Sequence, residues 1–221
     1  MRDSYREQLD DILGDLVQMS QAVSAAVRGA TTALLEADIH AAEQVISGDD
    51  AIDATQADIE SRAFSLLARQ APVAGELRTL VATLRMVTEL ERMGDLAAHV
   101  AKIARLRYPE PAVPDAMRAN FVRMGDVAEK MVVSAGQTLS ERNLQTAQEL
   151  HDRDQEMDEL RRSQFRALLG DDWTFGVEAA VDVALLGRYY ERIADHAASV
   201  ARRVVYVVTG EFPDDEVWPQ P

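Results

Sequence analysis

The sequence contains no cysteine among its 221 residues, which excludes disulfides, thiolate metal sites and cysteine nucleophiles. Basic residues are also few, because 23 Lys and Arg stand against 38 Asp and Glu and give a net charge of −15. That acidic excess would repel a phosphate backbone, so nucleic-acid binding is excluded. The longest apolar runs, such as 204–208, are too short for a membrane span, and the amino terminus lacks the apolar core of a signal peptide. We therefore expect a soluble, cytoplasmic protein with no membrane insertion.

Glycine and aromatic residues are scarce as well, at 11 residues and 5% respectively, and this composition is typical of a helical protein. Proline is absent from residues 1–71 and 115–212, whereas four of the seven prolines lie at positions 72, 109, 111 and 114. Because proline breaks helix interiors, this distribution permits long helices on both sides of a central break.

Apolar residues recur at three- and four-residue spacing along six stretches of the chain. This periodicity predicts helices over about 4–36, 38–71, 72–108, 115–140, 143–170 and 174–209. Asp38 and Asn143 are the predicted N-caps of the second and fifth helices. The faces expected to point inward include Phe64 and Leu67, then Leu77, Leu80, Val81 and Leu84, and in the second half Phe165, Val177 and Val181.

The two halves of the sequence repeat each other. Residues 91–97, ERMGDLA, recur one hundred positions later as ERIADHA at 191–197. A shift of 105 carries Asp49 and Asp53 onto Asp154 and Asp158. Ordered correspondences of this kind indicate duplication, so we predict an all-α fold of two tandem three-helix bundles. The expected domains are residues 1–108 and 115–209, joined by a Pro-rich linker at 109–114 and followed by an acidic, disordered tail at 210–221.

Four acidic pairs with a spacing of four residues interrupt the apolar stripes of the second, third, fifth and sixth helices. They comprise Asp49 and Asp53, Glu91 and Asp95, Asp154 and Asp158, and Glu191 and Asp195. Carboxylates that face one another across a bundle repel, so either arginines or metal ions must compensate them. The candidate arginines are Arg85, Arg92, Arg188 and Arg192. Carboxylates one helical turn apart, with oxygens ~6 Å from each other, also suit Fe, Mn, Mg or Zn. His99 and Ser199 continue two of these series.

Several of these segments resemble the PhoU family of bacterial phosphate-transport accessory proteins. The resemblance is carried by PVAGELR at 72–78, by ELERMGD at 89–95 and by YERIADHA at 190–197, and it covers residues 4–209. It implies two three-helix bundles, each with a multinuclear metal cluster of unknown identity, such as Fe, Zn, Mn or Mg, on its surface. The implied ligands are Asp49, Asp53, Glu91 and Asp95 for one cluster, and Asp154, Asp158, Glu191 and Asp195 for the other.

The resemblance also implies a regulator and not an enzyme. Such a protein would restrain phosphate uptake and phosphate-starvation signalling by binding a sensor histidine kinase and the ATPase subunit of the phosphate importer. The sequence is compatible with this role, since it has no Gly-rich phosphate loop and no kinase signature. We also expect a homodimer, because family members commonly pair and a partner could shield apolar residues such as Val204, Val205, Val207 and Val208.

Two other functions are weighed against this one. A carboxylate-bridged di-metal oxidase would place Glu three residues before a histidine, but Ala37, Leu96, Gln148 and Ile193 occupy those positions. The second alternative is a helical adaptor without a metal requirement. Metal content would separate the adaptor from a metal-binding regulator, and oxygen consumption would identify the oxidase.

Overall fold

The computed structural model describes the backbone of residues 2–70 and 72–213 and the side chains of residues 5–69 and 72–213. The described residues form six helices and no strand. The helices are α1 (Arg2–Glu36), α2 (Ile39–Gln70), α3 (Ala74–Arg107), α4 (Asp115–Glu141), α5 (Leu144–Leu168) and α6 (Gly176–Thr209). Each helix begins and ends within a few residues of its predicted bounds.

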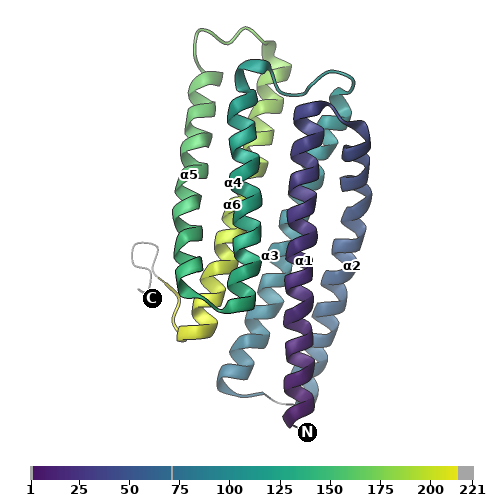
Figure 1. Ribbon diagram of the computed structural model, residues 1–221, viewed down its shortest axis with the longest axis vertical. Helices are drawn as coiled ribbons and strands as arrows, with labels where there is room; N and C mark the ends of the chain where they lie inside the picture. Colours follow the sequence, from purple (N-terminus) through teal and green to yellow (C-terminus); the bar gives the residue numbers. More distant parts are fainter. Residues whose placement is uncertain (1, 71, 214–221) are drawn as a thin grey trace.

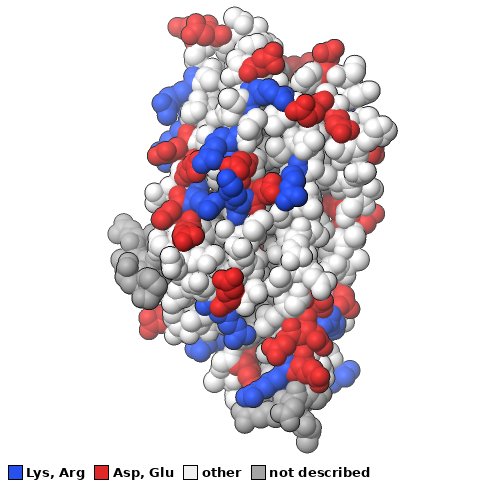
Figure 2. All heavy atoms as spheres, viewed as in Figure 1, with Lys and Arg blue, Asp and Glu red and all other residues white. Residues whose placement is uncertain are grey.

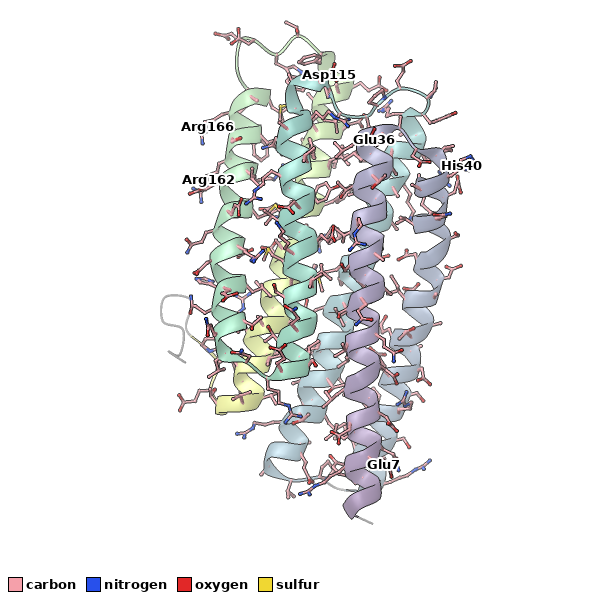
Figure 3. All side chains as sticks on the ribbon, viewed as in Figure 1. Glu7, Glu36, His40, Asp115, Arg162 and Arg166 are labelled. Atoms are coloured by element: carbon pink, nitrogen blue, oxygen red, sulfur yellow. The ribbon has the colours of Figure 1, made fainter. Side chains whose placement is uncertain are left out.

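The two predicted caps are present at the starts of α2 and α5. The Asp38 carboxylate accepts hydrogen bonds from the backbone N–H groups of His40 and Ala41, at 2.9 and 3.1 Å. The Asn143 side chain accepts one from the N–H of Gln145 at 2.8 Å. Each cap satisfies N–H groups that have no partner within the helix. Figure 3 shows His40 at the top of α2, close to Glu36 at the end of α1.

The six helices form two three-helix units that lie side by side in an elongated slab (Figure 1). Helices α1 and α4 cover the front of this slab, α3 and α6 lie behind them, and α2 and α5 form its outer edges. Contacts between α1 and α4 and between α3 and α6 join the units. The buried apolar residues of both units belong to one cluster, so the two repeats share a continuous core.

The packing of α1 against α4 reflects the internal duplication. Thr31 packs on Gly125, and Ser20 packs on Gly136, so closely that neither glycine could carry a Cβ without displacing its neighbour. A shift of 105 residues carries Ser20 onto Gly125 and Thr31 onto Gly136. The two contacts therefore lie at equivalent positions of the repeat, with both hydroxyl residues on α1 and both glycines on α4.

Several residues predicted to face the core are instead exposed at the surface. The clearest are Phe64, Val81, Val177 and Val181, which are 59, 45, 81 and 51% exposed, and Leu77 and Phe165 are exposed as well. These exposed residues belong to α2, α3, α5 and α6, the helices that also carry the acidic pairs. The buried face of α3 mixes large apolar residues with small and polar ones, such as Thr83, Gly94 and Ala97. The hydrophobic pattern was therefore wrong only in part for this helix, because Leu80 is fully buried whereas Leu77 and Val81 are exposed.

The expectation that a dimer partner shields the apolar residues at the end of α6 is also wrong in part. Val204 and Val205 are buried within the single chain, so they need no partner to shield them, although Val208 is partly exposed. The start of the predicted tail packs on α6, since the Phe212 ring stacks on Tyr206 with ring centroids 4.2 Å apart. Residues 214–221, the rest of the predicted disordered tail, lie outside the described residues.

Candidate functional site

The eight candidate carboxylates lie at the outer seams of the two repeats. In the first repeat, α2 carries Asp49 and Asp53 and α3 carries Glu91 and Asp95. The Asp49 Oδ1 atom lies 3.6 Å from the position that a Cβ on Gly94 would take. The Asp49 carboxylate therefore lies beside the turn of α3 that carries Glu91 and Asp95. The sequence prediction that these four residues share one seam is consistent with this contact.

The first seam holds carboxylates that repel one another. Burial raises the pKa of Asp49 above its usual value, and the charges of Asp95 and Asp53 raise it further. Burial also raises the pKa of Glu91, and Arg92 only partly opposes this effect. The nearest Arg92 nitrogens lie 3.6 Å from Glu91 and 3.7 Å from Asp95. Among the described residues, neither Asp49 nor Asp53 forms an ion pair, so Arg92, and the charge of Lys102 that acts on Asp49, compensate the first seam only in part.

The second seam has the same four acidic positions but contains two additional cations. Arg188 Nη1 lies 2.6 Å from the Glu191 carboxylate, and Arg161 Nε lies 3.5 Å from it. Arg161 is largely buried, stacks on the Phe165 ring and donates to the backbone oxygen of Ala184. Shifts of 105 and 100 residues place Gln56 and Thr88 at the corresponding positions of the first repeat. Arginines, one of the two predicted modes of compensation, therefore supply positive charge in the second seam.

Arg161 was not among the arginines predicted to compensate the acidic pairs. Its signal in the sequence is positional, because it lies three residues after Asp158 and so continues the acidic stripe of α5. Asp158, another acidic candidate of this seam, is exposed. Its carboxylate lies 3.8 Å from the guanidinium of Arg162, which points outward from α5 in Figure 3.

His99 and Ser199, which continue the acidic series, make contacts with the opposite repeat. The His99 ring stacks on Tyr189 of α6 with ring centroids 5.4 Å apart. Ser199 donates a hydrogen bond to Glu89 of α3 at 2.9 Å, and His196 Nδ1 lies 2.7 Å from the same carboxylate. These hydrogen bonds hold the pKa of Glu89 below its usual value despite burial. Both residues thus have a structural role between the repeats, and Glu89 was not singled out by the sequence.

The donor chemistry of the seams fits a hard or borderline cation better than any other ligand. Carboxylate oxygens from two helices meet at each seam, and their mutual repulsion would be relieved by positive charge. Within the described part of the chain, no three His, Asp or Glu side chains are placed closely enough to hold one metal ion. A bound ion would therefore require these side chains to turn toward one another. The first seam needs the smaller change, because the ion pairs that its carboxylates form with Arg92 are longer than the Arg188–Glu191 pair of the second seam.

The second seam gives the metal-free protein a defined pH dependence. Burial, together with the charges of Asp195 and Asp158, raises the pKa of Asp154 to about 6 from a usual 3.8, against the opposing effects of Arg202 and His151. The folded state then binds more protons than the unfolded state between these pKa values, so stability falls as pH rises through this window. Above it, the ionised Asp154 destabilises the fold.

Asp154→Asn is therefore expected to stabilise metal-free protein by ~1 kcal/mol at about pH 7.5, after allowance for solvent screening. The difference should vanish below about pH 4, where the wild-type carboxyl is protonated. Urea unfolding monitored by circular dichroism at both pH values measures the effect, and Glu159→Gln, at an exposed carboxylate of the same helix, is the control. Equal stabilisation at both pH values would mean that the carboxylate charge is not responsible.

Comparison with known proteins places these features in a family. The model of the PhoU domain matches residues 16–104 and 121–204, one stretch in each three-helix unit. The chain is 45% identical over 219 residues to the phosphate-specific transport system accessory protein PhoU homolog 1 of Mycobacterium leprae, covering 99% of each chain. It is 46% identical over 213 residues to PhoU homolog 2 of Mycobacterium tuberculosis, covering 96% of this chain and 100% of the relative.

Solved structures agree with this assignment. The crystal structure of PhoU from Pseudomonas aeruginosa superposes with a TM-score of 0.88 at 28% identity, covering 94% of this chain and 100% of the other. PhoU from Streptococcus pneumoniae gives a TM-score of 0.86 at 25% identity, with coverages of 95 and 99%. Two matched domains, close relatives of equal length and the shared six-helix architecture lead to one conclusion: the chain belongs to the PhoU family of phosphate-transport accessory proteins.

Proposed function

We propose that this protein is a cytoplasmic negative regulator of phosphate uptake and phosphate-starvation signalling. The observation that carries the proposal is the similarity over nearly the whole chain to relatives named as phosphate-specific transport system accessory proteins. Its role is that of a binding protein and not of an enzyme. Among the described residues, no helix is both long and apolar enough to cross a membrane.

The regulator acts by binding two partners, the sensor histidine kinase of the phosphate response and the ATPase subunit of the phosphate importer. Its long, exposed helices offer surfaces for such contacts, as helical proteins commonly do. The protein acts as a homodimer in this proposal. Light scattering at micromolar concentration tests that state, and a molecular mass of about 24 kDa alone would exclude it.

Metal ions belong to the proposed regulator as a source of positive charge at the acidic seams. Asp49, Asp53, Glu91 and Asp95 would hold one multinuclear cluster, and Asp154, Asp158, Glu191 and Asp195 the other. Iron, zinc, manganese and magnesium ions all accept carboxylate ligands. Two features of this chain support the assignment: the raised pKa values of Asp49 and Glu91, and the absence of an ion pair to Asp49 or Asp53 among the described residues.

Deletion of the gene is expected to switch on phosphate-scavenging genes in cells grown with ample phosphate, because the restraint on the kinase is lost. Reporter transcription measures the effect, and a plasmid copy of the wild-type gene should restore repression. Mycobacterium tuberculosis has two relatives of this chain, so any second copy in the host genome must be deleted too. Repression that persists without either copy would overturn the proposal.

A further inference from the structure

A groove of about 890 Å³ lies between α1 and α2, and none of the eight candidate carboxylates lines it. Its lining is rich in small residues, which include Ala22, Ala25 and Gly29 of α1 and Gly48, Ala51 and Ala54 of α2. Figure 2 shows the corresponding strip of the front face nearly free of charged side chains, whereas charges crowd the region over α4 and α5. The surface of the first repeat is thus hollowed and apolar where that of the second is charged.

The second repeat shows that the fold does not require small residues between the first two helices of a repeat. A shift of 105 residues carries Ala25, Gly48 and Ala51 onto Lys130, Arg153 and Glu156. There Arg123 of α4 bridges to α5, because its guanidinium lies 2.5 Å from the Glu156 carboxylate. The same architecture therefore accommodates long, charged side chains at these positions. The small residues of the first repeat leave an apolar hollow that the fold itself does not need.

The shape of the groove suits a single α-helix. Small residues on two neighbouring helices let the backbone of a third helix approach closely, and its side chains can then enter the groove between them. A Cβ built on Gly48 would meet no atom within 4 Å, so the groove is open at its centre. The volume lies within the range that natural binding clefts span, roughly 300–1,000 Å³.

The charged residues at one end of the groove indicate which charge the bound helix carries. Asp15 and Asp58 both line the groove, and Arg62 is the only cation among its lining residues. Arg62 contacts both carboxylates, at 2.5 and 2.9 Å, so the lining retains one negative charge in excess. The whole chain carries a net charge of −15, which favours a basic helix as the partner at this groove.

We propose that this groove docks one amphipathic α-helix of a partner protein. The helix presents small and medium apolar side chains to the alanines and glycines, with Lys or Arg on its flanks near Asp15 and Asp58. This inference does not depend on the phosphate-regulatory role, and it concerns a different surface from the acidic seams.

A displayed library of helical peptides tests the proposal directly. One half of the library varies Ala, Ser, Val, Leu, Ile and Met along one helical stripe with Lys on both flanks, and the other half carries Glu on the flanks. Selected peptides are then measured by fluorescence anisotropy against the full-length protein. Gly48→Gln fills the groove, and Gly14→Gln is the matched control, since Gly14 lies on α1 outside the lining and its Cβ would also meet no atom within 4 Å.

The proposal expects Lys-flanked peptides to be enriched over Glu-flanked ones, and Gly48→Gln to weaken their binding at least tenfold while Gly14→Gln leaves it unchanged. Equal enrichment of the two charge classes would overturn the proposal, as would equal binding to the two variants. If no peptide is selected, the partner helix is also rejected. In that case, a self-association that light scattering detects and Gly48→Gln abolishes would identify the groove as a contact between copies of this chain.

Discussion

Adding Mn²⁺ to metal-stripped protein is expected to raise its Tm by about 5–10 °C at a hundredfold excess over the dissociation constant. The reason is the only partly compensated charge of the first acidic seam, where burial and neighbouring carboxylates raise the pKa of both Asp49 and Glu91. A cation that binds only the folded state relieves this repulsion and stabilises it by mass action. Differential scanning calorimetry measures the shift, and elemental analysis counts the bound ions.

Variants of each seam show how much that seam contributes to the Mn²⁺-induced rise in Tm. Glu91→Ala with Asp95→Ala should remove most of the Mn²⁺-induced shift and empty the first seam while leaving the second. Glu191→Ala with Asp195→Ala should remove a smaller part, because Arg188 and Arg161 already compensate Glu191. The fold should survive metal removal, since the buried apolar cluster is continuous without the seams. An unchanged Tm and no bound metal in the wild-type protein would favour the metal-free adaptor.

Gly187→Val is expected to destabilise the protein by about 3 kcal/mol or more. The amide of Gln164 lies directly over Gly187, and any Cβ at this position would displace it. Gln164 is fully buried, donates to the backbone oxygen of Val183 at 3.0 Å and accepts from Arg161 at 2.7 Å. Displacement would leave a buried amide without these partners. Urea unfolding of the variant measures the loss.

The first repeat supplies the compensating change. Ile59 and Val87 occupy the positions that correspond to Gln164 and Gly187, and both are fully buried. Adding Gln164→Ile to Gly187→Val should therefore recover most of the lost stability, because the pair reproduces packing that the other repeat already uses. If the double variant is no more stable than Gly187→Val alone, the direct clash between these two positions is not the cause.

The sequence predicted the helices well because their boundaries depend on local chemistry. Prolines at 72 and 109 separate α2 from α3 and α3 from the linker, and the caps Asp38 and Asn143 each bind the N–H groups of the helix that follows. These signals act within a few residues, so they can be recognised in the sequence without knowledge of the tertiary structure.

The orientation of the helices was harder to predict, because α3 packs against α1, α2 and α6 at once. A helix with three neighbours buries most of its circumference, and its most apolar stripe need not be its most buried one. Leu77 and Val81 are exposed, whereas Thr83 is fully buried. The contact between Gln164 and Gly187 could not be predicted from the sequence either, because its prediction requires knowing which positions of α5 and α6 touch.

Restoring repression in the deletion strain with seam variants tests most directly whether the acidic seams carry the function of this accessory protein. The strain receives either the wild-type gene or a gene with Asp49→Asn, Asp53→Asn, Glu91→Gln and Asp95→Asn, and immunoblotting confirms equal protein levels. Transcription of phosphate-scavenging genes at high phosphate is then measured. Our account predicts that the wild-type gene silences them and the variant leaves them active. Full repression by an equally abundant variant would contradict it.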